Sequence, residues 1–335
     1  MLNILLLGLT SLLADFSSEM IVPILPFYIQ ALGGSGVVIG LIFGVGDAVA
    51  AVLRVLSGYV ADKTKRYKSL VFGGYLFSSL AKFAYPFAGG LAQIAVIRPI
   101  ERLGKGVRDA PRDAIVSESV PESERGRGFG IQRAMDSLGA IIGSVVVLVL
   151  FVMLGLSFRS IFLVSAFISV AAVIPIFFVK VPRGLQASRK AVSFKKLSPK
   201  ARAFIGIATL FALANFSNAF FLLRAQGSFS GFSWQGALGL TLSLYIFFNL
   251  FDAVFSEPAG ALSDRIGRRR TIIIGYSLFS VVTLGFLLMS LFRITNYEYL
   301  VFLLLFAVYG MFKAFIDASQ RAFVSDLSPD EVRGT

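Results

Sequence analysis

The stretch Gly58-Tyr-Val-Ala-Asp62-Lys63-Thr-Lys-Arg66 decides the fold, because the chain contains it twice. Its second copy is Gly260-Ala-Leu-Ser-Asp264-Arg265-Ile-Gly267-Arg268. Each copy follows one long apolar run and precedes another, so each is expected to be a short turn between two helices. A repeat in this position indicates a chain built from two halves with the same internal order.

The composition favours a membrane protein. The 335 residues are 56% hydrophobic and 15% charged, whereas a soluble domain needs more charged residues to cover its surface. The chain contains no Cys and no His, which excludes disulfides, thiolate or imidazole metal sites and His-dependent catalytic triads. We therefore expect no metal, no other cofactor and no enzymatic activity, and any proton transfer must use carboxylates.

Ten apolar stretches are long enough to cross a bilayer, which requires about 20 residues of helix. No small-residue cleavage site follows the first stretch, so we expect it to remain as a membrane helix. The predicted fold class is an all-α membrane protein with about ten transmembrane helices. The predicted spans are 4–31, 37–60, 69–87, 90–108, 129–154, 159–180, 203–224, 235–258, 271–292 and 298–318.

The positive charge follows the topology of such a protein. The net charge is +13, but the basic residues lie in gaps between apolar runs rather than on one face, which argues against nucleic-acid binding. They follow the second, fourth, sixth and eighth spans, whereas the connections 32–36, 85–90 and 155–158 contain no Lys or Arg. The positive-inside rule then predicts a cytoplasmic N-terminus in a multi-pass protein of the plasma membrane.

A second internal match supports two halves. The segment Val116–Gly126 resembles Val324–Gly334, and both follow a fourth helix of their half. We expect a six-helix N-terminal half (1–180), a basic cytoplasmic linker (181–202) and a C-terminal half (203–335). The C-terminal half contains four helices, and the fifth and sixth helices that would complete it are expected to be missing. The alternative is a natural ten-helix protein.

The repeated turn resembles the Gly-x-x-x-Asp-(Arg/Lys)-x-Gly-Arg-(Arg/Lys) loop of the major facilitator superfamily, which follows the second helix and recurs after the eighth. The second copy fits throughout, and the first has Lys65 in place of the second Gly. The resemblance implies the facilitator fold, with two six-helix pseudo-repeats, and loops that lock one access state. Gly58 would permit close helix approach and Asp62 would stabilise a helix N-terminus. The loop residues implied are Gly58, Asp62, Lys63, Arg66, Gly260, Asp264, Arg265, Gly267 and Arg268.

Two further stretches resemble parts of this family. The segment from Arg98 to Asp113 is similar to the fourth-helix signature of an incompletely characterised prokaryotic branch. Gly139 and Gly143 resemble the glycine pattern of antiporters, which favours export. The alternative for these glycines is a face of small residues that packs against another helix.

Ionisable residues within the spans define the candidate site, because each costs about 2.5–3.5 kcal/mol in a membrane helix and normally faces a cavity or a partner. Asp15 and Glu19 share one helix face, as do Asp47 and Arg54. The family fold implies that helices one and four line a central cavity, where the α-helical stripe of the fourth span would approach Asp15 and Glu19. The residues of this site are Glu19, Asp15, Asp47, Arg54, Arg98, Glu101, Arg102 and Lys105.

Two interpretations of these charges remain open. They can pair as a purely structural network, which their balanced signs favour, or some of them can bind substrate and carry a proton. Two carboxylates on one face repel each other when ionised, so one should accept a proton readily. We favour Glu19 first, then Asp15 and Asp47. In the C-terminal half the candidate cavity residues are Asn215, Asn218, Asn249 and Asp252.

The predicted function is secondary active transport of a small solute by alternating access, coupled to protons and directed outward. Proton-coupled uptake, uniport and lipid handling are the alternatives. The chain has no Walker-type phosphate loop, which argues against ATP-driven pumping. The expected partners are a small-molecule substrate, protons and the lipid bilayer, with no nucleic acid, and the family resemblance implies a monomer.

Overall fold

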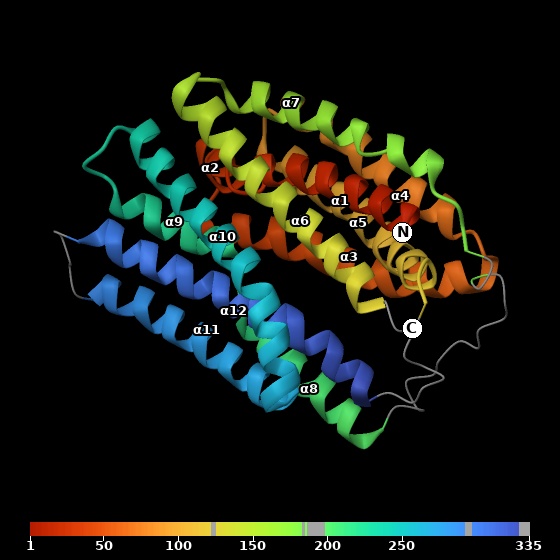
Figure 1. The fold of residues 1–335 in the computed structure, drawn as a ribbon. Coiled ribbons are helices and arrows are strands. Elements are labelled where there is room, and N and C mark those ends of the chain that lie inside the picture. Colours follow the sequence, from red (N-terminus) through yellow and green to blue (C-terminus); the bar gives the residue numbers. More distant parts are fainter. Residues whose placement is uncertain (122–124, 183–184, 186–197, 292–296, 328–335) are drawn as a thin grey trace. The chain divides into compact units, whose positions relative to one another are not determined.

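A computed structural model describes residues 1–121, 125–182, 185, 198–291 and 297–327, and these residues are almost entirely helical, without a strand (Figure 1). The all-α prediction is confirmed. The chain forms two compact units, Met1–Ala191 and Val192–Thr335, which we describe separately. The first unit contains α1 (Leu2–Ile21), α2 (Leu25–Ala31), α3 (Gly36–Thr64), α4 (Tyr67–Lys82), η1 (Tyr85–Phe87), α5 (Leu91–Glu118), α6 (Arg125–Leu148), η3 (Val149–Met153), α7 (Phe158–Ala171) and η4 (Ile174–Phe178). The second contains α8 (Pro199–Ala214), α9 (Asn218–Ser228), α10 (Trp234–Ile266), α11 (Arg268–Leu291) and α12 (Glu298–Leu327).

Every predicted span coincides with a helix or a consecutive pair of helices. Eight of these elements are long and apolar enough to cross a membrane within the described residues. The third and fourth spans are outside that set for physical reasons: α4 has only 16 residues, and α5 carries a dense series of charged residues. These two elements lie side by side, and the charges of α5 are covered by its neighbours.

The first span of each unit is interrupted, which the sequence prediction of continuous spans 4–31 and 203–224 missed. Residues 22–24 separate α1 from α2, where Pro23 lacks the N–H group that a continuing helix requires. Residues 215–217 separate α8 from α9. There Asn215 has an extended backbone, and the Ser217 side chain caps the next helix by accepting from the Ala219 N–H (3.3 Å). Short polar side chains bond the backbone locally and so compete with the helix.

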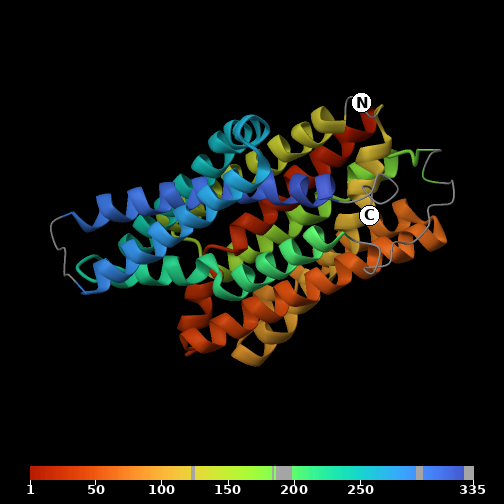
Figure 2. The ribbon, with the colours of Figure 1, turned by 90° about the horizontal axis from the view of Figure 1, so that it is seen from below.

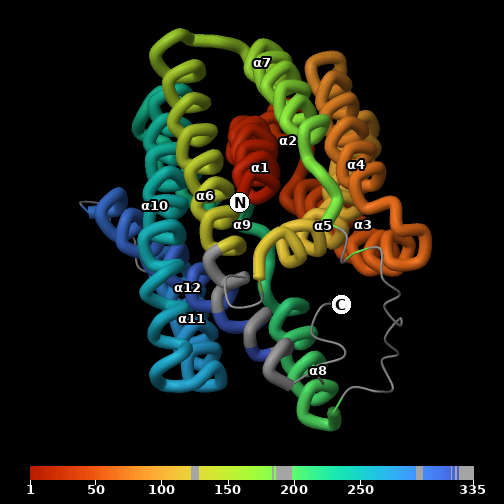
Figure 3. Tube along the Cα trace, turned by 45° about the vertical axis from the view of Figure 1, so that its right-hand side comes forward, coloured from red at the N-terminus to blue at the C-terminus, as the bar shows by residue number. Residues whose placement is uncertain are grey.

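Helix α1 lies between α6, α7 and α5 in the first unit (Figure 3). Its closest packing is against α6, where a Cβ added to Gly139 would collide with the Leu12 backbone and one added to Gly143 would collide with the Phe16 carbonyl oxygen. Small residues permit this approach in a membrane, where dispersion contacts drive helix association. These contacts support the packing interpretation of the two glycines.

Helix α5 is held between α3 and α4 by glycine contacts. A Cβ on Gly106 would lie 2.5 Å from the Ala50 carbonyl oxygen of α3, and a Cβ on Gly104 would lie 2.6 Å from the Gly74 carbonyl oxygen of α4. Both neighbouring backbones therefore approach α5 closely, and they cover its charged side chains.

The second unit repeats this arrangement. Helix α12 packs against both α10 and α11, and it runs alongside α11 in Figure 2. Gly310 of α12 meets the α10 backbone at Phe248, and Gly275 of α11 meets Ile316 of α12. Thus α3 and α4 pack against α5, and α10 and α11 pack against α12, as the repeated turn predicts. Most of the second match, from Ser328 onward, lies outside the described residues.

The two repeated turns differ by one residue, and this shifts the register after them. Lys65 and Arg66 separate α3 from α4, but Gly267 alone separates α10 from α11. Lys65 and Gly267 occupy the same position, and both have positive φ, 59° and 94°. The extra residue in the first turn makes Gly74 the structural counterpart of Gly275. Aligning the two turn sequences from Gly58 and Gly260 without a gap pairs Gly275 with Gly73 instead. Gly73 has no atom within 4 Å of an added Cβ.

Candidate functional site

Helix α5 carries the charged core of the first unit. It has 28 residues and contains Pro99 and Pro111, and it extends well beyond the predicted span 90–108. Its start is fixed by the Gln93 side-chain oxygen, which accepts from the N–H groups of Gly89 (2.6 Å) and Gly90 (3.2 Å). Four of its charged residues are at most 4% exposed, namely Arg98, Glu101, Arg108 and Asp109.

Arg98 and Glu101 form a closed ion pair. Arg98 donates to Glu101 Oε2 (2.7 Å), and the Tyr85 hydroxyl donates to the same oxygen (3.0 Å). The guanidinium also lies over the Phe43 ring, 5.1 Å from its centroid. Because both side chains are about 5% exposed or less, this pair is sealed from solvent and lipid.

Two further ion pairs join α5 to α3, and both are more open. Arg102 pairs with Asp47, and Arg54 pairs with Asp109. The Asp47 side chain is 54% exposed although this residue lies near the middle of α3. Asp47 and Arg54 therefore share one helix face, as predicted, but they bind different partners on α5.

Lys105 and Arg108 have no carboxylate within 4.0 Å in the part of the chain that the structure describes. Arg108 instead lies over the Tyr75 ring, 4.1 Å from its centroid. Lys105 experiences the negative charges of Asp15 and Asp109 and the positive charge of Arg102. The α5 stripe thus combines paired cations with cations that have no close counter-charge.

Asp15 and Glu19 lie on α1, and both are half-buried. The predicted proximity of these carboxylates to Arg98 and Arg102 is not seen as direct pairing, because those arginines bind Glu101 and Asp47. The charge of Asp15 acts instead on Lys82 and Lys105. Glu19 has its Cβ against Gly143 of α6.

Sequence reasoning missed two residues of this network. Tyr85 completes the Glu101 cluster from η1, and nothing in its local sequence distinguishes it from other interfacial tyrosines. Asp136 of α6 has a buried carboxylate oxygen, Oδ1, without a hydrogen-bond partner, and it interacts electrostatically with Asp15 and Arg112. It lies within the predicted span 129–154, so its charge at membrane depth is the sequence signal that identifies it.

The loop residues make different contacts in the two copies. Asp62 accepts from the Tyr67 hydroxyl (2.7 Å), so it bridges the turn through this side chain, and no side chain caps the N-terminus of α4. Asp264 instead pairs with Arg268 (2.5 Å). A Cβ added to Gly58 would lie 3.4 Å from the Ala110 Cβ, whereas a Cβ added to Gly260 would meet no atom within 4 Å. The remaining basic loop residues are exposed, namely Lys63, Arg66 and Arg265.

The candidate residues of the second unit fall into two groups. Asn215 and Asn218 flank the break between α8 and α9. Asn249 and Asp252 are buried on α10. Lys313 of α12 lies 3.4 Å from Asp252 Oδ2 and 2.9 Å from Asp317 Oδ2. This unit therefore has its own acid–base cluster, in which Asp252 is buried and Lys313 and Asp317 are partly exposed.

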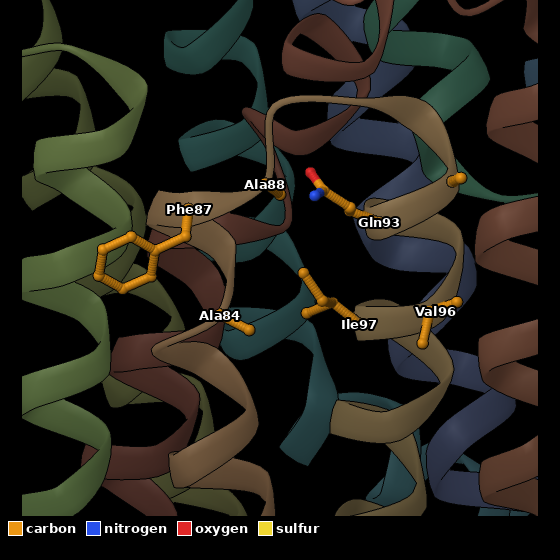
Figure 4. Close-up of a pocket in the computed structure, with 7 residues that line it drawn as sticks. Ala84, Phe87, Ala88, Gln93, Val96 and Ile97 are labelled. Atoms are coloured by element: carbon orange, nitrogen blue, oxygen red, sulfur yellow. The ribbon is translucent and has the colours of Figure 1, made fainter.

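A cavity of about 590 Å³ lies between η1 and the start of α5 (Figure 4). Its lining is apolar apart from Gln93, whose oxygen caps α5, so the cavity contributes no charged group to the network. No group of three or more Asp or Glu side chains in the described ranges could hold a metal ion. The cavity is lined by Ala84, Phe87, Ala88, Ala92, Gln93, Val96 and Ile97.

Two units of apolar helices with ionisable residues at membrane depth are typical of a multi-pass membrane transporter. A model of the Major Facilitator Superfamily matches residues 7–335, and the chain belongs to this family. Members of the family are transporters that bind small-molecule substrates, and their fold is not that of enzymes.

Known relatives support this assignment at different levels. An uncharacterised MFS-type transporter of Methanocaldococcus jannaschii is 42% identical over 99% of this chain and 82% of its own length. The multidrug resistance protein MdtH of Aeromonas hydrophila is 27% identical over 41% of this chain and 35% of its own length. The solved nucleoside transporter NupG has the same fold, with a TM-score of 0.74 at 17% identity over 100% of this chain and 85% of that protein.

Proposed function

We propose that this protein is a proton-coupled secondary transporter that exports a small solute by alternating access across the plasma membrane. In this mechanism the substrate site would open to one side of the membrane at a time. The N-terminus would be cytoplasmic, and a single chain would form the transport unit.

The open Asp47–Arg102 pair carries this proposal. Asp47 lies near the middle of a 29-residue membrane helix, yet its side chain is 54% exposed. A charged side chain at this depth cannot face lipid without a large cost. This face of α3 and α5 is therefore expected to line a water-filled cavity, where a polar solute can bind.

Proton coupling would use the carboxylates that face this cavity. When Asp47 is ionised it pairs with Arg102, and when it binds a proton the arginine is released to contact substrate or another carboxylate. Glu19 and Asp15 on α1 are the further candidates for proton binding, and Glu19 remains our first choice. The partial similarity to MdtH, a multidrug resistance protein, supports the outward direction.

The test is proton flux into proteoliposomes that contain the full-length protein and a pH-sensitive dye. A panel of cationic, neutral and anionic solutes is applied to wild type, Asp47→Asn and Glu19→Gln, with Glu298→Gln at the start of α12 as the matched control. We expect one solute class to drive proton movement in wild type and the control, and movement to be lost in Glu19→Gln and reduced in Asp47→Asn.

Direction is tested by comparing inside-out and right-side-out vesicles. Accumulation of the solute only in inside-out vesicles with an acidic interior agrees with export. Folded wild-type protein that moves no protons with any solute would contradict the proposal.

A further inference from the structure

Lys82 is a completely buried lysine in the membrane-spanning part of the first unit. Its side chain lies at the end of α4 and the residue is 1% exposed. Its ammonium nitrogen donates to Ser17 Oγ (2.8 Å) and Ser18 Oγ (3.0 Å), both on α1. In the described ranges no carboxylate lies within 4.0 Å of this nitrogen, so two neutral hydroxyl groups are its hydrogen-bond partners.

The neighbouring charges do not supply a direct counter-ion. Glu101 is already paired with Arg98 and accepts from Tyr85. The charges of Glu101 and Asp15 attract the ammonium, while Arg108 and Arg98 on α5 repel it. An ammonium that is desolvated without a paired carboxylate is costly to maintain, and lysine is the basic side chain that most readily changes protonation when buried.

The two serines suit both protonation states of Lys82. A hydroxyl group can donate and accept, and its hydrogen rotates freely. The charged ammonium donates to both serine oxygens. The neutral amine can accept a hydrogen bond from Ser18, because the Ser17 hydroxyl already donates to the Ser165 carbonyl oxygen. A carboxylate in the same position would stabilise only the charged form.

The surrounding contacts hold this site in place. Ser17 Oγ donates to the Ser165 carbonyl oxygen of α7 (2.7 Å), and Ser79, one turn before Lys82, donates to the Ser169 carbonyl oxygen (2.8 Å). These bonds fix α1, α4 and α7 together without Lys82. The lysine is therefore not required to join these helices.

We propose that Lys82 is a proton-binding site that alternates between ammonium and neutral amine during the transport cycle; this rests on the proposed function. When the amine takes a proton from a hydronium ion, one O–H bond breaks and one N–H bond forms, and the products are water and an ammonium. The charge of the site rises by one in this step, and it falls by one when the proton leaves for solvent.

Protonation of Lys82 can be measured without a substrate. Full-length protein with ¹³C at the lysine ε-carbons is placed in lipid nanodiscs, and the Lys82 resonance is assigned by its absence in Lys82→Arg. We expect this resonance to leave the ammonium position below about pH 9, whereas a free lysine side chain in water keeps its proton until about pH 10.4. A Lys82 resonance that stays at the ammonium position up to about pH 9 would overturn the proposal.

Transport assays then test whether the titration serves coupling. Lys82→Arg keeps a permanent charge and Lys82→Met keeps the volume without charge, with Lys180→Met as the control. We expect both Lys82 variants to lose solute accumulation driven by a pH gradient but to retain solute exchange without a gradient. A Lys82→Met protein of normal thermal stability that still couples overturns the proposal. If wild type itself shows no coupling, the proposed function fails, and the titration alone decides whether Lys82 binds a proton.

Discussion

At the scale of single residues, α5 carries two kinds of ion pair within about one helical turn. Arg98–Glu101 is sealed, with side chains about 5% exposed or less, while Arg102–Asp47 is open, at 20% and 54%. A sealed pair cannot exchange partners with water or solute without unpacking its surroundings. An open pair can. The first is therefore expected to serve stability and the second to serve transport.

This division predicts that two similar substitutions lower the free energy of unfolding by very different amounts. Glu101→Gln leaves Arg98 buried without its counter-charge and should lower the free energy of unfolding by about 3–5 kcal/mol. Asp47→Asn removes a solvent-exposed partner and should cost less than about 1 kcal/mol, although it impairs transport. Equilibrium unfolding in detergent measures both changes in the free energy of unfolding. The double variant Arg98→Met/Glu101→Met should recover part of the loss, and equal destabilisation by the two single variants would contradict the division.

At the scale of elements, hydropathy predicted where the helices lie but not how they pack. The ten apolar spans follow from length and composition alone. The breaks after Ile21 and Ala214 depend on local backbone bonding, which apolar periodicity does not reveal. The Arg98–Glu101 pair was predicted as part of a stripe, but its closure by Tyr85 comes from a third element. Which glycine contacts a neighbouring helix also depends on the length of the preceding turn.

Adjacent glycines of α4 provide a test of this packing. A Cβ on Gly74 would lie 2.7 Å from the Gly104 carbonyl oxygen and 2.8 Å from the Arg108 Cβ, whereas a Cβ on Gly73 meets nothing within 4 Å. Gly74→Ala should therefore destabilise the protein by about 1–3 kcal/mol through overpacking. Gly73→Ala should be neutral, or stabilising by up to ~1 kcal/mol, because alanine favours helix.

The measurement is the unfolding transition of both variants in the same detergent. Identical helix propensity at the two positions makes Gly73→Ala the matched control. If Gly73→Ala were the destabilising variant, the one-residue shift between the two repeated turns would be wrong.

At the scale of the whole molecule, the two units share a packing scheme but differ in their charges. In the first unit α3 and α4 pack against α5 through glycine contacts, and in the second unit α10 and α11 pack against α12 in the same way. The first unit places a long charged stripe on α5, while the described part of the second carries the shorter cluster Asp252, Lys313 and Asp317. The sequence predicted the duplication from two internal matches, the repeated turn and the segment that follows the fourth helix of each half. The partners of each charge could not be predicted, because they come from helices far apart in the chain.

The loop charges predict the orientation of the molecule in the membrane. Because the chain contains no cysteine, single introduced cysteines can be labelled to test this orientation directly. Ser35 precedes α3 and Thr64 ends it, and both residues are exposed. The lysine- and arginine-rich turn beside Thr64 should be held in the cytoplasm, since basic loops are retained there. In intact cells a membrane-impermeant maleimide should label Ser35→Cys, and it should label Thr64→Cys only after permeabilisation. Because α3 has 29 residues and is long and apolar enough to cross the membrane once, labelling of both sites from outside would contradict this span. Labelling of Thr64→Cys alone would invert the predicted topology and, with it, the side from which we propose that Asp47 exchanges protons.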